Sequence, residues 1–287
     1  MSSVLSVRQN FFRISWRAIN ILLVVSMMAL VYSAGWEYSV RRYLDGFSDA
    51  IVPAGATPEK RVEAILDWMR TGPPRSEDSS PTGLAMRDPE NTLNYQQLLS
   101  VCGTATNAFL NLARSSDLQA RRLLLLTPDR NTKHVVAEVM LNGRWIVVDP
   151  TYRVILRNPA GEMVTRSELR DPRAFAAVIG SVPGYPVEYN YENFAHVRVA
   201  RLPLQGLQLR LILDRMLPGW EEKLDWSLLL ERESFLVLTM SAWVTLVLFA
   251  LRLMLGWYAR KWKLPRFPLW SQLTRAGSAF FTTPEIK

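Results

Sequence analysis

The sequence predicts an α+β domain with an antiparallel sheet, flanked by two transmembrane helices. Two long apolar stretches lie toward the two ends of the 287-residue chain. Between them, amphipathic helical patterns come first and a strong hairpin signal follows. Helices followed by paired strands favour an α+β arrangement with an antiparallel sheet. No internal repeat is present in the chain.

Each apolar stretch is long enough to cross a membrane. Residues 18–36 contain no charged side chain, and about 20 apolar residues span a bilayer core of roughly 30 Å. Residues 235–258 are interrupted only by Arg252, whose head group can extend to the interface. A cleaved signal peptide is the alternative for the first stretch. Its apolar run exceeds the roughly 7–15 residues of a signal-peptide core, so we expect an uncleaved anchor.

The distribution of basic residues predicts the orientation of both spans. Arginines precede the first span, and a collar of basic and aromatic residues follows the second. The positive-inside rule then places residues 1–17 and 259–287 in the cytoplasm. Residues 37–234 are expected on the other side of the plasma (inner) membrane, which is the periplasm in a diderm bacterium.

This distribution also explains the formal charge of +8. Basic residues that cluster beside apolar stretches indicate membrane topology rather than a nucleic-acid surface. The sequence contains no zinc-finger pattern, phosphate-cradling glycine loop or RNA-binding aromatic motif. It also contains no His, Cys and Asp cluster with metal-ligand spacing. We therefore expect no nucleic-acid partner, no metal and no cofactor.

Two helices are expected at the start of the exported region. Thr57-Pro58 provides a cap and a proline at the first helical position, and Gly72 ends this helix. Residues 73–91, rich in Pro, Ser, Asp and Arg, are expected to form a loop. A second helix is expected to begin near Cys102 and to continue through Ala113. The apolar faces that support these two helices consist of Val62, Ile65, Leu66 and Met69, and of Ala105, Phe109 and Leu112.

Strands are expected to follow these helices. Residues 121–126, which end in four leucines, are typical of a buried strand. Residues 134–141 and 144–148 flank Asn142-Gly143, a dipeptide typical of a two-residue hairpin turn.

The hairpin register brings two polar side chains onto one face of the sheet. If Leu141 faces Arg144, Asp149 lies opposite Val136 and His134 is two positions along on the same face. Such a diagonal pair is roughly 7–8 Å apart at the backbone, within reach of an imidazole and a carboxylate. A slip of one residue would place His134 and Asp149 on opposite faces.

Cys102 adds a nucleophile to this pair. It is the only cysteine of the chain, and a lone cysteine outside the cytoplasm is unusual unless it is buried or used. At a helix N-terminus the dipole and free amides stabilise the thiolate. Nucleophilic catalysis needs a thiolate, a histidine and a third group that orients the imidazole. Taken singly, Cys102 fits a buried packing residue, His134 a surface position and Asp149 the start of a turn.

Four segments of the chain carry a family resemblance. They are residues 99–103 (LSVCG), 118–122 (LQARR), 134–139 (HVVAEV) and 143–151 (GRWIVVDPT). In this order they resemble the transglutaminase-like core, over about residues 55–155. The resemblance implies a papain-like domain with Cys102 as nucleophile, His134 as general base and acid, and Asp149 as orienting group.

An oxyanion hole would complete such a site. The Cys102 backbone amide is one candidate donor, by analogy with papain-like enzymes. Gln96 is the candidate side-chain donor, with Gln97 and Asn94 as competitors.

Three further residues have competing interpretations. We expect Trp145 in core packing rather than in contact with substrate. Glu138 shares the face of His134 and fits either the family pattern or a structural salt bridge. His196 is expected to have a surface or packing role.

The resemblance implies a mechanism more closely than a substrate. The superfamily includes crosslinking transferases, peptidases, amidases and members without activity. We expect a protein or peptide amide to be attacked through a thioester, with hydrolysis favoured over acyl transfer because water needs no second binding site. The alternative is a catalytically silent module that binds or scaffolds an envelope or polysaccharide-production complex. The bilayer and envelope proteins are the other expected partners.

Residues 155–234 have no clear pattern. The segment from 201 to 217 interleaves basic and apolar residues, which fits a membrane-surface helix or an ordinary amphipathic core element.

Overall fold

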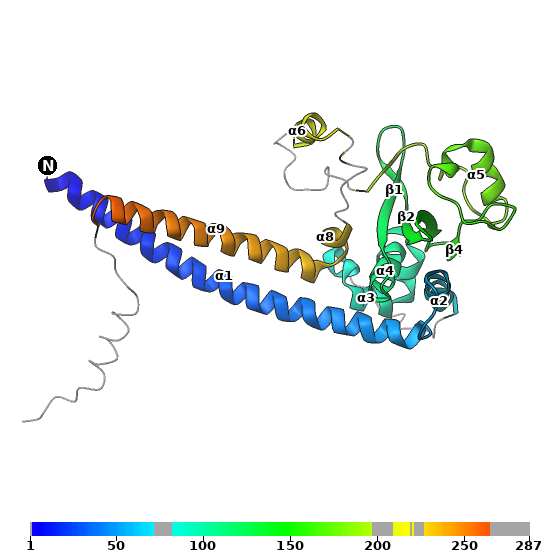
Figure 1. Cartoon of the computed structure of the whole chain (residues 1–287), viewed down its shortest axis with the longest axis horizontal. Coiled ribbons are helices and arrows are strands. Elements are labelled where there is room, and N and C mark those ends of the chain that lie inside the picture. Colours follow the sequence, from blue (N-terminus) through cyan, green and yellow to red (C-terminus); the bar gives the residue numbers. More distant parts are fainter. Residues whose placement is uncertain (1, 72–81, 197–208, 219, 221–226, 265–287) are drawn as a thin grey trace, which may run out of the picture. The chain divides into compact units, whose positions relative to one another are not determined.

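The computed structural model describes residues 2–71, 82–196, 209–218, 220 and 227–264 (Figure 1). The chain divides into two compact units. One comprises Met1–Ala34 and Val237–Lys287, and the other comprises Gly35–Leu236.

The first unit contains parts of two long helices, α1 (Ser2–Ile51) and α9 (Glu233–Lys261). Both helices are long and apolar enough to cross a membrane, and they include the two predicted spans. The ring of Phe12 lies 6.5 Å from that of Tyr258, and Arg252 Nε donates to Asn20 Oδ1 at 2.8 Å. The two helices therefore run antiparallel, and the arginine inside the second span has a polar partner on the first. Membrane crossing and orientation stay predictions.

The second unit begins inside α1. At about 1.5 Å per residue, a 50-residue helix is roughly 75 Å long, more than twice the thickness of a bilayer core of roughly 30 Å. The C-terminal part of α1 packs into the core of the second unit: Leu44 is fully buried there, and Tyr43 and Phe47 pack against the same core. The chain thus continues as one helix well past residue 36, the expected end of the span.

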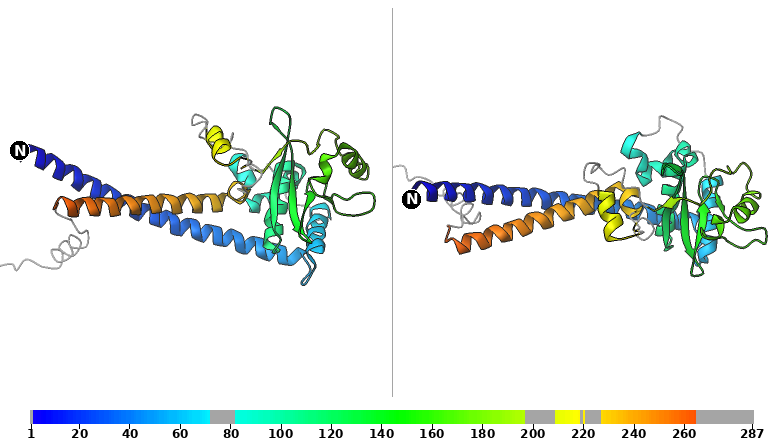
Figure 2. Two further views of the ribbon diagram at one scale, coloured as in Figure 1. Left: turned by 45° about the horizontal axis from the view of Figure 1, so that its top comes forward. Right: turned by 90° about the horizontal axis from the view of Figure 1, so that it is seen from above.

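A five-stranded antiparallel sheet forms the centre of the second unit (Figures 1 and 2). The strand order is β4-β3-β2-β1-β5, and the α+β prediction is confirmed. The strands are β1 (Ala120–Leu126), β2 (Thr132–Leu141), β3 (Arg144–Asp149), β4 (Val154–Ile155) and β5 (Phe194–Ala195).

The hairpin between β2 and β3 has the predicted turn and register. Asn142 and Gly143 both have positive φ, 51° and 75°, as a type I′ turn requires. Leu141 faces Arg144, and the pairing continues without a shift to Ala137 and Val148. No slip occurs, so the side chains beyond these pairs keep their predicted faces.

The sheet is covered on both faces. Ala137, Val139 and Val148 pack with α2 (Pro58–Thr71) and α4 (Cys102–Ser115). The alternate residues Val136 and Val147 pack on the opposite face, in the cluster that contains α5 (Pro172–Ile179). Burial on both faces explains why these strands read as nearly continuous apolar runs.

The predicted loop at 73–91 is partly wrong, although residues 72–81 lie outside the described part. The described remainder contains the 3₁₀ helix η1 (Gly83–Arg87) and the start of α3 (Pro89–Asn94), followed by η2 (Gln96–Ser100). Asp88 caps α3, because its side chain accepts from the Glu90 amide at 3.1 Å. Asp88-Pro89 was therefore a readable helix start.

Short elements complete the second unit: η3 (Glu168–Arg170), α6 (Leu209–Met216) and α8 (Ser227–Glu231). The segment from 201 to 217 lies partly outside the described residues. Its described part includes α6, where Leu211 and Met216 are exposed, and this agrees with the membrane-surface interpretation without testing it.

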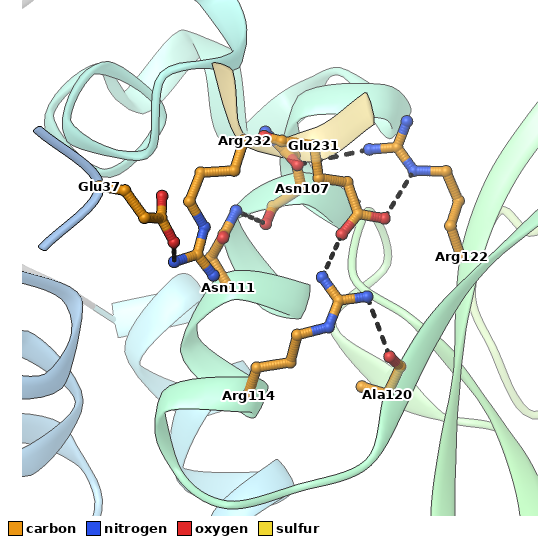
Figure 3. Close-up of polar contacts among 8 residues, drawn as sticks. All are labelled: Glu37, Asn107, Asn111, Arg114, Ala120, Arg122, Glu231 and Arg232. Atoms are coloured by element: carbon orange, nitrogen blue, oxygen red, sulfur yellow. Dashed lines mark hydrogen bonds and ion pairs between the residues drawn. The ribbon is translucent and has the colours of Figure 1, made fainter. Parts of the chain in front are cut away.

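A buried ionic network joins α8 to α4 and β1 (Figure 3). Glu231 is fully buried. Its carboxylate lies 2.5 Å from Arg114 Nη1 and 3.4 Å from Arg122 Nε. Its backbone carbonyl accepts from Asn107 Nδ2 at 2.9 Å. Arg114 and Asn107 belong to α4, so this network holds the helix that begins at Cys102.

The next residues of the chain connect to α1 within the same unit. The buried carboxylate of Glu37 accepts from Arg232 Nη1 at 3.0 Å and from Ser234 Oγ at 2.7 Å. Arg41 Nε lies 2.6 Å from the same carboxylate. Residues 231–234 therefore tie both α4 and α1 to the start of α9.

Glu231→Gln is expected to destabilise the second unit by about 3 kcal/mol, because it leaves two arginines around a neutral buried group. Glu233→Gln removes the same charge two residues away from a less buried position and is expected to change stability by less than about 0.5 kcal/mol. Urea unfolding of the full chain in detergent, monitored by tryptophan fluorescence, checks both expected changes in stability. Equal effects of the two substitutions would contradict the structural role of this network.

Candidate active site

Cys102 is the first residue of α4, and no side chain caps this helix start. Val101 occupies the N-cap position, so the first-turn amides keep their partial positive charge beside the thiol. The Cys102 side chain is half-buried and packs against the cluster that includes Leu124 and Val135. The site thus holds the sulfur against the sheet while leaving part of it accessible.

His134 and Asp149 meet as the hairpin register predicts. His134 Nε2 lies 2.7 Å from Asp149 Oδ2, and both side chains are almost completely buried. Asp149 Oδ1 accepts from the amides of Thr151 at 3.0 Å and Tyr152 at 3.3 Å. Asp149 therefore starts a turn and also contacts the imidazole of His134; its role as the orienting group stays a prediction.

His134 is the main influence on the titration of the thiol. Hydrogen bonding to His134 lowers the pKa of Cys102; burial opposes the effect, and the charge of His134 and the amides of Val135 and Gly103 reinforce it. Because Nε2 is engaged by Asp149, Nδ1 is the ring nitrogen left for Cys102.

The pKa of His134 moves in the opposite direction. Burial lowers it, but hydrogen bonds and charges of Asp149 and Cys102 outweigh burial and raise the pKa to about 9. A thiolate facing an imidazolium is the protonation state that these two shifts favour.

Three tyrosines that the sequence did not single out surround the imidazole. Tyr189 stacks on His134, with ring centroids 4.1 Å apart and an interplanar angle of 5°. Tyr152 and Tyr185 approach the same ring edge-on, at 6.2 and 6.4 Å. Tyr185 and Tyr189 lie in a tyrosine-rich stretch that also contains Tyr191. This stretch was the available signal, but nothing in the local pattern linked it to His134.

Gln96 is the first residue of η2, and its side chain is exposed. Asn94 is also exposed, whereas Gln97 is half-buried. The assignment of any of them to an oxyanion hole stays a prediction.

Three further residues that the sequence analysis discussed make contacts away from the Cys102 thiol. Glu138 is buried and lies 2.8 Å from Arg121 Nε, in agreement with the salt-bridge interpretation. His196 is buried and lies 2.7 Å from the Arg122 carbonyl through Nδ1, which fits a packing role. Trp145 lies outside the described core clusters; it is half-buried beneath the Arg121 guanidinium, 4.0 Å from the ring centroid. The core-packing prediction for Trp145 was therefore wrong.

Within the described ranges, no group of three or more His, Cys, Asp and Glu side chains is arranged to hold a metal ion. The chemistry available at this site is that of a thiol, an imidazole and a carboxylate.

Residues 45–150 match the family model of the transglutaminase-like superfamily. The match includes Cys102, His134 and Asp149 and ends before all three tyrosines around the imidazole. No curated protein and no solved structure matches the chain.

Iodoacetamide is expected to alkylate Cys102 with a midpoint pH below that of a free thiol, because His134 lowers the pKa of the thiol. His134→Ala removes the largest cause of this shift and should move the midpoint up toward about 8.5. Mass spectrometry reads the result without ambiguity, since the chain has one cysteine.

His196→Ala is the matched control, because His196 is the other histidine of the chain and is equally buried. It should leave the midpoint unchanged. A wild-type midpoint at the free-thiol value, with no response to His134→Ala, would contradict the ion pair.

Proposed function

We propose that the transglutaminase-like domain of residues 45–150 belongs to a membrane-anchored cysteine enzyme that acts on amide bonds. Cys102 is the nucleophile, His134 the general base and acid, and Asp149 the group that orients the imidazole. The observation that carries the proposal is the buried 2.7 Å contact between His134 and Asp149, next to a thiol whose pKa His134 lowers.

The reaction begins when the Cys102 thiolate attacks the carbonyl carbon of the amide. A carbon–sulfur bond forms, the carbon–nitrogen bond breaks, and the imidazolium of His134 gives its proton to the departing amine. The neutral imidazole then accepts a proton from the second nucleophile, which attacks the thioester and releases Cys102 as thiolate. Asp149 keeps Nε2 protonated throughout, so that Nδ1 serves both transfers.

The second nucleophile decides between hydrolysis and acyl transfer. Water gives a peptidase or amidase, and an amine gives a crosslinking transferase. We favour hydrolysis, because water needs no binding site of its own. A protein or peptide is the substrate class that fits an amide-directed thiolate.

Charge on the tetrahedral intermediate requires donors near the sulfur. The backbone amide of Cys102 at the start of α4 is suited to this role, because no side chain caps the helix there. Gln96 is the side-chain candidate, six positions upstream.

p-Nitrophenyl acetate tests the acylation step in the full chain in detergent. The thiolate should displace p-nitrophenolate and leave one acetyl group on Cys102, visible by mass spectrometry. His134→Ala should slow this step by about 10²-fold or more.

Addition of cadaverine tests which second nucleophile accepts the acetyl group. Free acetate as the main product supports hydrolysis, and acetylcadaverine as the sole product would overturn the preference for hydrolysis.

Cys102→Ala is the control for acetylation elsewhere on the chain. Equal p-nitrophenolate release by this variant and the wild type would count against catalysis. It would favour the silent binding module in its place.

We further propose that the enzyme lies in the plasma (inner) membrane, with the domain outside the cytoplasm and both termini inside. The support is the two long apolar helices, their antiparallel contact and the basic residues outside them. Envelope proteins are the partners that such a location offers.

In spheroplasts, a membrane-impermeant maleimide should label Cys102 before lysis. A variant combining Ser6→Cys with Cys102→Ala carries its single thiol on the opposite side of the first span and should react only after lysis. Labelling of both before lysis, or of neither, would contradict the proposed orientation.

A further inference from the structure

The segment after α5 is fixed at two buried tyrosines. Tyr185 and Tyr191 lie in the cluster that contains Phe175, and their hydroxyl oxygens are 3.4 Å apart. Between them the chain turns, with the Tyr189 amide donating to the Pro186 carbonyl at 3.2 Å. These anchors fix the position of the residue between them.

A second anchor joins this segment to the strand that carries the histidine. Lys133 Nζ donates to Asn190 Oδ1 at 2.8 Å. Lys133 directly precedes His134, and Asn190 directly follows Tyr189. The chain segments that carry the two stacked residues are therefore joined directly beside the stack.

The stack itself constrains how the imidazole can move. His134 contacts Asp149 through Nε2 and acts on Cys102 by hydrogen bonding, and such bonds are strongest when the partner lies in the plane of the ring. Any tilt of the ring misaligns both bonds. A parallel ring at 4.1 Å blocks this tilt on one face, and its negative face also favours the imidazolium form.

We propose that Tyr189 is a positioning residue of the site: its ring stacks on the His134 imidazole and holds it in the plane that joins Asp149 to Cys102. The inference rests on the proposed function of these three residues. It extends the site beyond the family-matched residues, which end at 150.

The groups that face His134 determine what a change in the reactivity of Cys102 reports. Cys102 comes from α4, Asp149 from the end of β3, and Tyr152, Tyr185 and Tyr189 from the chain beyond it. Burial raises the pKa of each tyrosine, so the phenols stay neutral and only Cys102 and Asp149 bring charge. A change in reactivity of Cys102 on altering Tyr189 therefore reports loss of the stacked ring rather than loss of a charged group.

The test compares alkylation of Cys102 by iodoacetamide at pH 6.5 across variants of the full chain. Tyr189→Ala frees the imidazole to tilt, weakens its hydrogen bond to Cys102 and is expected to slow alkylation about three- to tenfold. Tyr189→Phe keeps the ring and should react like the wild type. Val187→Ala, at an exposed position of the same segment, is the matched control and should also be unchanged.

A spectroscopic signature separates stacking from a general loss of structure. The ring protons of His134 should be shifted upfield by Tyr189 in proton NMR, and the shift should persist in Tyr189→Phe. The chain has two histidines, so His196→Ala assigns the signals. Tyr189→Leu fills similar space without a π face; it should lose the upfield shift and be alkylated more slowly than the wild type, and it decides the question if Tyr189→Ala does not fold.

The possible failures are distinguishable. If Tyr189→Leu or Tyr189→Ala folds and reacts like the wild type while His134→Ala does not, the positioning role is overturned and the proposed function stands. If Tyr189→Phe is as slow as Tyr189→Ala, the hydroxyl matters and the stacking proposal is overturned. If wild-type Cys102 behaves as an ordinary thiol, the proposed function itself fails.

Discussion

The site depends first on the register between β2 and β3. His134 and Asp149 are 15 residues apart in the chain and come within 2.7 Å because the Asn142-Gly143 turn fixes which residues face each other. A slip of one position would turn Asp149 to the face covered by α4 and bury an unpaired carboxylate there. The same slip would turn Val147 of β3 out of the cluster that it shares with Val136 of β2. The register between β2 and β3 therefore fixes both the packing of these two strands and the geometry of the candidate site.

The position of the thiol is fixed by a different set of contacts, made by residues of α4 that follow Cys102. Cys102 gains its position from α4, and α4 is held by Arg114 and Asn107 against Glu231. Those contacts are costly to form, since three charged groups leave water, yet they fix one helix to residues that directly precede α9. A buried network of this kind specifies an orientation more sharply than apolar packing alone would.

Sequence reasoning succeeded where the signals were local and failed where they were not. The hairpin turn, the helix start at Cys102 and the shared face of His134 and Asp149 follow from short-range rules of spacing and turn chemistry. The stacking of Tyr189 and the pairing of Glu231 with Arg114 depend on contacts across 55 and 117 positions, which no periodicity encodes. The helix start at Asp88-Pro89 was readable locally and was missed because the surrounding composition resembled a loop.

The family match ends at residue 150, between the residues proposed to carry out the chemistry and the tyrosines around the imidazole. The groups with the chemistry, Cys102, His134 and Asp149, all lie within residues 45–150. The aromatic residues that enclose the imidazole, Tyr152, Tyr185 and Tyr189, all lie beyond it. The match therefore covers the three groups that the proposed mechanism uses, whereas the proposed positioning residue Tyr189 lies outside it. If Tyr189 holds the imidazole as proposed, the site needs residues on both sides of position 150, and the matched core alone does not complete it.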